Sequence, residues 1–247
     1  MPFAAEKGGL RTLCTALLAS AALLAASPAP SVAHHVKMQS GPFGGMVSAL
    51  AISPENPQRV YAAVFGGGIF RSDDGGTLWT AKSTRLTDTR AYGVVELPAG
   101  GGVLAATATG VFRSDNRGES WERSSAGLPD TSARMFALLS GGRVLVATGA
   151  GVFLSRDGGR TWAASSRGLE NRDVRWLTVE PDEKRKVFAA TFGGLYTSGD
   201  GGRTWRANAN ALPSLRAAAV GPGGRSVIAG SASRGLFASE DGGMTFR

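Results

Sequence analysis

Short apolar runs separated by turn-forming segments recur along most of the chain. One set of runs reads VYAAVFGGGIFR, VLAATATGVFR, VLVATGAGVFL, VFAATFGGLYT and VIAGSASRGLFA, and a shorter run such as VSALAIS, AYGVVEL or VRWLTVE precedes it. Segments rich in Gly, Pro or charge, including SPENPQR, PAGGG and PDEKRK, lie between the two. Runs of roughly four to eight Val, Leu, Phe and Ala residues with such boundaries are typical of β-strands. No pattern of helical period is long enough to compete, so we expect an all-β protein.

An octet of similar sequence follows each pair of apolar runs. Its five copies are SDDGGTLW, SDNRGESW, SRDGGRTW, SGDGGRTW and SEDGGMTF, and successive copies are 42, 41, 43 and 41 residues apart. So even a spacing indicates an internal structural repeat. The repeated positions are Ser72, Asp74, Gly76 and Trp79; Ser114, Asn116, Gly118 and Trp121; Ser155, Asp157, Gly159, Thr161 and Trp162; Ser198, Asp200, Gly202, Thr204 and Trp205; and Ser239, Asp241, Gly243, Thr245 and Phe246.

Each repeat supplies an inner strand, a second strand, a third strand that ends at the octet, and a fourth strand that starts at the octet's aromatic residue. Four short antiparallel strands in about 42 residues are typical of a β-propeller blade. The sequence therefore predicts a β-propeller of five four-stranded antiparallel blades, with approximate limits 44–83, 90–126, 132–166, 173–209 and 214–247.

Closure of the ring is a separate expectation. The sequence stops two residues after Thr245, where the outer strand of the fifth blade has barely begun. Residues 36–39 precede the first inner strand by the number of residues that separates an outer strand from the next inner strand in the other repeats. We therefore expect them to form the outer strand that completes the fifth blade. The alternatives are a fragment of a larger propeller or closure by pairing of chains, because an uncovered sheet edge tends to pair. The sequence leaves a monomer and an edge-paired oligomer both open.

The octet resembles the Asp-box, or bacterial neuraminidase repeat, of pattern Ser-x-Asp-x-Gly-x-Thr-Trp. Two copies match every defined position, and the others depart at Leu78, Asn116, Ser120 and Phe246. Asp, Asn, Ser and Gly build tight turns, and a Trp can fill the wedge between blades. We interpret the octet as architecture and expect the Asn116 copy to keep its turn. Calcium binding is an alternative, although each copy offers only one or two carboxylates. Five equivalent positions around a ring cannot form one active site.

The first 33 residues have the pattern of a secretory signal peptide. Lys7 and Arg11 precede the apolar run 12–26, and small residues end the segment at Ala33. The run is shorter than the roughly 20 residues of a membrane span, so an uncleaved anchor is the less favoured alternative. The only cysteine, Cys14, lies in this segment. We therefore expect an exported domain, periplasmic or secreted, with no disulfide, no thiol nucleophile and no further transmembrane segment.

The expected mature domain is basic. The chain has 27 Lys and Arg against 19 Asp and Glu, and the leader removes two of the former and one of the latter. A positive field of this kind attracts anionic partners. We expect a protein or an anionic glycan as partner and no nucleic acid. The two histidines, His34 and His35, are adjacent at the expected mature N-terminus. A copper site there would need a second histidine held by structure, so we expect no metal and no cofactor.

Four inner strands begin with an arginine when they are aligned on their alternating apolar residues. The alignment gives Arg90-x-Tyr92-x-Val94, Arg134-x-Phe136-x-Leu138, Arg175-x-Leu177-x-Val179 and Arg216-x-Ala218-x-Val220, with Ser48 in the first blade. The starts of the inner strands lie at one mouth of a propeller's central channel. Guanidinium groups gathered there would bind carboxylate or phosphate, with Tyr92 and Trp176 beside them. The alternative is that the arginines pair with loop carboxylates or extend into solvent.

The repeats also resemble the photosystem II stability and assembly factor-like family of exported propellers. That resemblance implies an assembly scaffold without catalytic residues. Sialidase-type and sortilin-type propellers are more distant, because their loop insertions and the sialidase Arg-Ile-Pro segment before the first repeat are missing. The expected function is a non-catalytic binding scaffold that recognises an anionic partner at the arginine-lined mouth.

A glycoside hydrolase, sialidase-like or endoglucanase-like, is the alternative function. Such an enzyme needs two converging carboxylates, or a Tyr with acidic partners. The acidic residues Glu96, Glu180, Asp182 and Glu183 fall in or beside blade turns, where we expect solvated surface charges. We therefore assign no catalytic residue.

Overall fold

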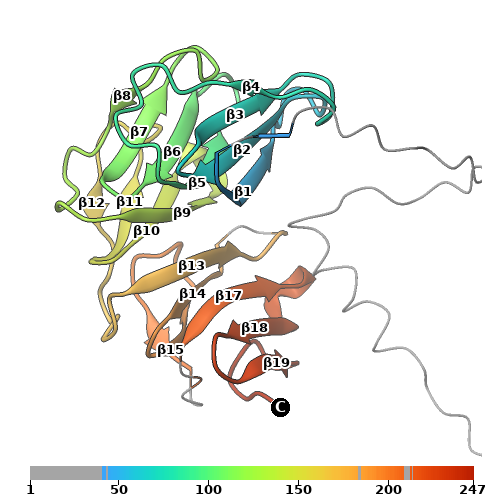
Figure 1. The fold of residues 1–247 in the computed structure, drawn as a ribbon. Helices are drawn as coiled ribbons and strands as arrows, with labels where there is room; N and C mark the ends of the chain where they lie inside the picture. Colours follow the sequence, from blue (N-terminus) through green and yellow to red (C-terminus); the bar gives the residue numbers. More distant parts are fainter. Residues whose placement is uncertain (1–40, 43, 183–184, 209–211, 213) are drawn as a thin grey trace, which may run out of the picture.

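The computed structural model describes residues 41–247 apart from 43, 183–184, 209–211 and 213, and its strands form five antiparallel sheets (Figure 1). Each sheet is built of hairpins in chain order. We call the sheets blades 1 to 5. Their strands are β1 (Met46–Ile52), β2 (Val60–Phe65), β3 (Gly68–Ser72) and β4 (Thr80–Ala81); β5 (Ala91–Glu96), β6 (Val103–Thr107), β7 (Gly110–Ser114) and β8 (Glu122–Arg123); β9 (Ala133–Leu138), β10 (Val144–Thr148), β11 (Gly151–Ser155) and β12 (Ala163–Ala164); β13 (Val174–Val179), β14 (Val187–Thr191), β15 (Gly194–Ser198) and β16 (Arg206–Ala207); and β17 (Leu215–Val220), β18 (Val227–Ser231) and β19 (Gly235–Ser239).

The blades follow one another around an arc. The inner strands β1, β5, β9, β13 and β17 pack side by side in that order, and the other strands of each blade extend outward from them (Figure 1). Two one-turn 3-10 segments, Ser140–Gly142 and Pro222–Gly224, connect strands in blades 3 and 5. The prediction of a five-bladed β-propeller is confirmed.

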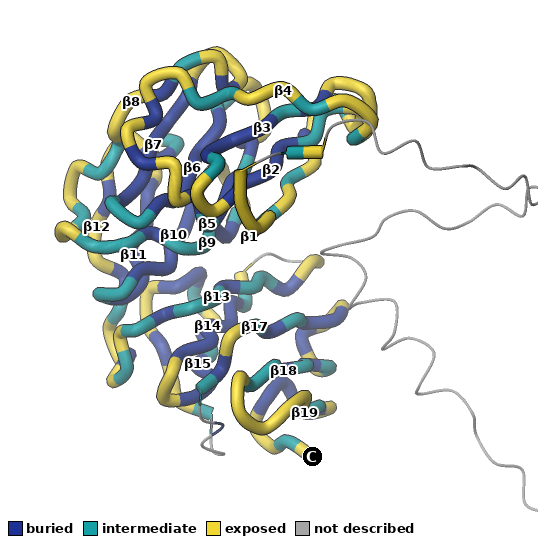
Figure 2. The backbone as a smooth tube through the Cα atoms, in the orientation of Figure 1, coloured by how far each residue is buried: buried dark blue, intermediate teal, exposed yellow. Residues whose placement is uncertain are grey.

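Apolar side chains fill the spaces between consecutive blades. The second strands β6, β10 and β14 are buried at every residue because a blade covers each of their faces (Figure 2). This explains the continuous apolar runs in the sequence, which lack the alternation of a sheet with one wet face. Trp121, Trp162 and Trp205 belong to the clusters between blades 1 and 2, 2 and 3, and 3 and 4.

The fifth blade has three strands in the described part of the chain, where four were expected. The Ala238 and Arg247 amides each donate to the other's carbonyl at 3.0 Å, in the way that Thr80 pairs with Arg71 at the start of β4. Arg247 thus stands at the position where the fourth strand begins in blade 1. The expected closing segment 36–39 and the expected leader, with His34 and His35, lie outside the described residues. Within those residues, no helix has the length and apolar character to cross a membrane.

Candidate functional site

The five octets form one kind of turn. In the third copy, the Ser155 hydroxyl donates to Asp157 Oδ1 at 2.8 Å and accepts a hydrogen bond from the Gly159 amide at 2.7 Å. Asp157 also accepts bonds from the Arg160 and Thr161 amides and, at 2.6 Å, from the Thr161 hydroxyl. The side-chain oxygen at the Asp157 position accepts amide bonds in every other copy as well, at Asp74, Asn116, Asp200 and Asp241.

These bonds use the octet side chains within their own turns. Partial burial raises the pKa of Asp157 and Asp200, but hydrogen bonds from the turn outweigh it and bring each pKa down to about 2. Asn116 keeps the turn, as expected, because its Oδ1 accepts the Ser120 amide and its Nδ2 donates to the Ser120 hydroxyl, both at 2.9 Å. An amide that replaces the carboxylate without loss of the turn favours architecture over metal binding.

Each inner strand has a β-bulge near its start, at the expected channel mouth. Pairing with the second strand skips one residue per blade, namely Ser48, Tyr92, Arg134, Arg175 and Arg216. The residue of blade 2 that is equivalent to the three later arginines is therefore Tyr92. The sequence alignment of Arg90 with them is wrong by two residues. Arg90 stands just before β5 and pairs with Phe65 of blade 1.

Carboxylates accompany three of the four arginines. Arg90 Nε donates to Asp88 Oδ1 at 2.9 Å. Arg134 of blade 3 and Arg175 of blade 4 both donate to Asp173, with 2.6 Å from Arg175 Nη2 to Asp173 Oδ2. Partial burial raises the pKa of Asp173, and the two arginines more than offset it, so its pKa lies below the ordinary value.

Arg216 differs from the other arginines. Its side chain is exposed and forms no ion pair within the described part of the chain, and Ser214 stands where an Asp precedes Arg175. The four arginines therefore face two carboxylates and keep a net positive charge. The alternative of pairing with loop carboxylates holds for three of them. Asp88 and Asp173 were missed in the sequence, although the pattern Asp-x-Arg is readable at both.

Both aromatic residues proposed for the mouth also take part in packing. Tyr92 lies against Phe65 of blade 1, with 5.4 Å between ring centroids and 41° between ring planes. Trp176 is half-buried and packs on the apolar cluster between blades 4 and 5. Both residues are only partly buried, so part of each side chain stays accessible to solvent.

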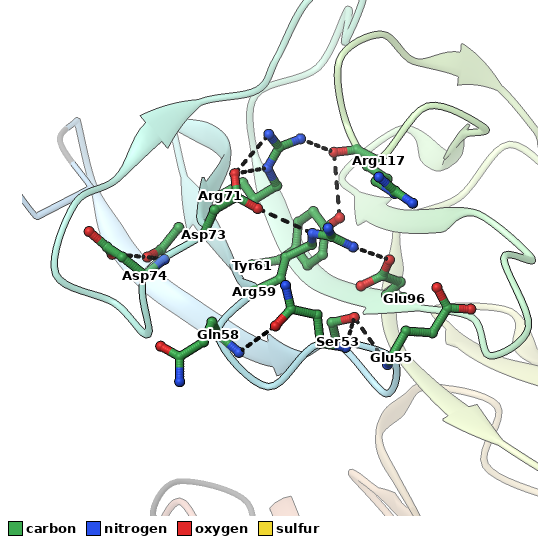
Figure 3. Close-up of polar contacts among 12 residues, drawn as sticks. Ser53, Glu55, Gln58, Arg59, Tyr61, Arg71, Asp73, Asp74, Glu96 and Arg117 are labelled. Carbon is green, nitrogen blue, oxygen red and sulfur yellow. Dashed lines mark hydrogen bonds and ion pairs between the residues drawn. The ribbon is translucent and has the colours of Figure 1, made fainter.

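A partly buried polar cluster joins blades 1 and 2 (Figure 3). Arg59 Nη1 donates to Glu96 Oε1 at 3.4 Å, and Arg59 Nε donates to Asp73 at 3.2 Å. The Tyr61 hydroxyl donates to the Arg117 carbonyl at 3.4 Å. Glu96 is only 6% exposed and Tyr61 is fully buried. Glu96 is thus not the solvated charge that we expected; it was misread because the blade interface, which the sequence does not display, covers it.

The same cluster bears on the hydrolase alternative. Burial, assisted by the charge of Glu96, raises the pKa of Tyr61 to about 12. A tyrosine nucleophile needs access to substrate and a phenol that ionises easily, and Tyr61 has neither.

Glu180 is also buried, which corrects the second expected surface charge. It is 4% exposed, and its Oε1 accepts hydrogen bonds from the Asp182 amide at 2.9 Å and the Gly223 amide at 3.2 Å. Asp182 Oδ2 accepts from the Gly223 amide as well, at 2.9 Å. Glu180 and Asp182 therefore hold the turn of blade 4 to that of blade 5. Glu183 lies outside the described residues.

Surface grooves repeat on the outer rim between neighbouring octets. The groove between blades 3 and 4 has a volume of about 390 Å³ and is lined by Arg156 and Arg203. Its counterparts lie between blades 2 and 3, with about 430 Å³, and between blades 4 and 5, with about 670 Å³. The grooves recur at these three successive interfaces, so they follow from the repeat.

Comparisons with known proteins support the fold. No protein-family model matches the chain, and no curated protein matches it. Among solved structures, the chain is similar to an ancestral GH74 enzyme, with a TM-score of 0.70 and 20% identity over 84% of this chain and 31% of that one. It is also similar to YCF48 bound to a D1 peptide, with a TM-score of 0.57 and 15% identity over 80% of this chain and 65% of that one.

A further similar structure is YCF48 from Cyanidioschyzon merolae, with a TM-score of 0.51 and 15% identity over 84% of this chain and 86% of that one. The chain spans about a third of the length of the GH74 enzyme and about two thirds of the peptide-bound YCF48. At these identities the similarity establishes the propeller fold and no activity.

Proposed function

We propose that this chain is an exported, non-catalytic scaffold that binds an acidic segment of a partner protein at the channel mouth. The observation that carries the proposal is the charge imbalance there. Arg216 is exposed and without an ion pair among the described residues, while Arg90, Arg134 and Arg175 share Asp88 and Asp173. Partner carboxylates would complete this set, because guanidinium groups bind carboxylates through two parallel hydrogen bonds.

Two further points support the proposal. The YCF48 structure with a D1 peptide has the same fold, so a propeller of this kind can hold a peptide. The Ser, Asp and Thr side chains of the octets are engaged in their own turns, whereas the side chains at the inner-strand mouth differ from blade to blade. Export rests on the signal-peptide pattern of the first 33 residues.

Fluorescence anisotropy of a labelled poly-glutamate peptide tests this function. Because a hydrogen bond to a charged group contributes about 1.5 to 3 kcal/mol, Arg216→Ala should weaken binding about tenfold or more. Arg203→Ala is the matched control, since Arg203 is exposed but lies in the rim groove between blades 3 and 4. Equal affinities for the wild type and both variants would overturn the proposal. Much stronger competition by polygalacturonate than by unlabelled poly-glutamate would assign the site to an anionic glycan.

A glycoside hydrolase is the second candidate, and it rests on the fold shared with the GH74 enzyme. Against it, the approach of Tyr61 to Glu96 is enclosed between blades 1 and 2. A panel of chromogenic glycosides tests it directly. Turnover of any of them by the purified protein would favour the hydrolase and count against the scaffold.

A further inference from the structure

The two faces of a blade have different partners. We call the face toward the preceding blade the leading face and the opposite one the trailing face. On the leading faces of blades 2, 3 and 4, the octet tryptophans Trp121, Trp162 and Trp205 are 1%, 5% and 3% exposed. Their indole Nε1 atoms donate to carbonyl groups of the preceding blade, at Lys82, Ser124 and Ser165, over 2.7 to 2.9 Å. The interfaces between blades 1 and 2, 2 and 3, and 3 and 4 thus share the same hydrogen bond, and blade 5 has Phe246 at this position.

In blade 1, the indole N–H of the octet tryptophan finds its hydrogen-bond acceptor within the same blade. Trp79 is half-buried, and its Nε1 donates to the carbonyl of Gly76 in its own octet, at 2.9 Å. In later blades the carbonyl at the Gly76 position accepts a bond from the preceding blade: Gly159 from Ser124 and Gly202 from Ser165, both at 2.6 Å. In blade 1, the Trp79 indole and the Gly76 carbonyl therefore bond to each other. In later blades, the preceding blade supplies the partner of each of these groups.

Two apolar side chains of β1 on the same face of blade 1 are exposed. Leu50 is 53% exposed, although the equivalent residues in blades 2 to 5 are at most 7% exposed; these are Val94, Phe136, Leu177 and Ala218. Ile52, two residues further along β1, is 56% exposed. The leading face of blade 1 thus has the composition of an interior interface and is uncovered along β1, whereas β2 and β3 are largely buried (Figure 2).

The trailing face of blade 5 shows the complementary situation. Leu236 on β19 is 70% exposed, while its equivalents in blades 1 to 4 are at most 1% exposed; these are Ile69, Val111, Val152 and Leu195. Ile228 on β18 is half-buried. In each interior interface, the trailing face of one blade covers the leading face of the next. The trailing face of blade 5 is therefore the kind of surface that could cover the exposed part of blade 1.

Among the described residues, the strands of blades 1 and 5 do not pack extensively against each other. They stand at opposite ends of the arc, and β1 and β17 are not packed neighbours (Figure 1). Bringing them together would change the angle at each interior interface, and those interfaces have little room. A methyl group added at Gly93 would lie 2.8 Å from the Arg134 carbonyl, and one at Gly159 would lie 2.6 Å from Leu104.

We propose that the leading face of blade 1 receives the trailing face of blade 5 from a second copy of this chain. The contact is head-to-tail, because two different faces meet, and it requires no change within either arc. It is an assembly surface separate from the mouth, so it does not depend on the proposed peptide binding. A single contact leaves the blade 5 face of one copy and the blade 1 face of the other open to further copies.

Sedimentation velocity of the full chain over a range of concentrations tests the contact. The wild type should associate, and Leu50→Glu and Leu236→Glu should each sediment as monomers, since each variant destroys one of the two faces. An equimolar mixture of the two variants should form a heterodimer, because the first keeps its blade 5 face and the second keeps its blade 1 face. Phe192→Glu is the control, as Phe192 is 53% exposed in the hairpin between β14 and β15; it should associate like the wild type.

Contrary outcomes are equally clear. A wild type that is monomeric at all concentrations, or a variant mixture that stays monomeric, would overturn the proposal. If both variants were monomeric but also melted well below a monomeric wild type, the faces would be covered within one chain. Leu50→Ser and Leu236→Ser provide milder versions should a glutamate prevent folding. Peptide binding by Leu50→Glu should equal that of the wild type, which separates this test from that of the mouth.

Discussion

Each blade has one octet turn and one inner-strand bulge. The turns keep their hydrogen bonds from blade to blade, whereas the bulges keep only their backbone geometry. The turns vary in sequence, with Asn116 in place of Asp, and keep the same hydrogen bonds. The bulge positions keep the same backbone geometry and carry Ser48, Tyr92 or an arginine. A position whose contacts survive substitution serves the fold. A position whose geometry survives while its chemistry changes from blade to blade can serve recognition.

The largest effect should come from the octet tryptophans. Trp162→Ala should lower the free energy of unfolding by about 3 to 5 kcal/mol, because it leaves a cavity between blades 2 and 3. Trp79→Ala should cost less than half as much, since Trp79 is half-buried and no blade in the described chain covers it. Urea denaturation of both variants measures the difference. Equal losses would mean that blade 1 is covered as fully as the interior blades.

Loss of an octet carboxylate should have a smaller effect. Asp157→Ala removes the acceptor of the Arg160 and Thr161 bonds and should cost roughly 1 to 3 kcal/mol. Asp157→Asn is the matched control, because Asn116 already forms this turn in blade 2, and it should cost less than about 1 kcal/mol. Thermal melts of the two variants compare them. Calcium-dependent melting of the wild type that disappears in Asp157→Asn would instead make the octet a metal site.

The octet carboxylates also predict a pH dependence. The folded state lowers the pKa of Asp157 and Asp200 from an ordinary value of 3.8 to about 2. Their stabilisation is therefore fully present above about pH 4 and is lost as the pH falls through about 2. Melting temperatures measured across this range should decline, and the decline should be shallower in Asp157→Asn/Asp200→Asn. Identical profiles for the two proteins would show that these carboxylates do not contribute.

The smallest effect concerns the mouth. Asp173→Asn frees Arg134 and Arg175 from their shared carboxylate, so the mouth becomes more positive. Binding of poly-glutamate should tighten by up to about fivefold, since such partly exposed pairs contribute up to about 1 kcal/mol. Anisotropy at low salt measures this change, and added salt should reduce it. Weaker binding by Asp173→Asn would mean that Asp173 positions the arginines for the ligand.

Much of the fold could be predicted from the sequence, because five octets at even spacing fix both the number of blades and the strand order within each. The inner-strand register of blade 2 could not. Alternation has a period of two, so moving Arg90 onto the position of Tyr92 leaves every apolar residue on the same face. Only the pairing of Glu96 with Val103 at the far end of the hairpin fixes the register.

The burial of Glu96 and Glu180 was also out of reach of the sequence. Each lies next to a turn, where acidic residues are usually solvated, and each is covered by a neighbouring blade that contacts it only in the folded arc. The pairs of Arg90 with Asp88 and of Arg175 with Asp173 were within reach, because they join residues two positions apart. The contact of Arg134 with Asp173 crosses between blades and was not.

The central claim is that the octets hold the propeller together while the mouth binds a partner. Parallel measurement of melting temperature and poly-glutamate affinity in two variants tests it most directly. Arg134→Ala/Arg175→Ala/Arg216→Ala should lose peptide binding and melt near the wild-type temperature, and Asp157→Ala should melt lower yet bind the peptide normally while folded. Undiminished binding by the triple arginine variant, or loss of binding by folded Asp157→Ala, would contradict the account.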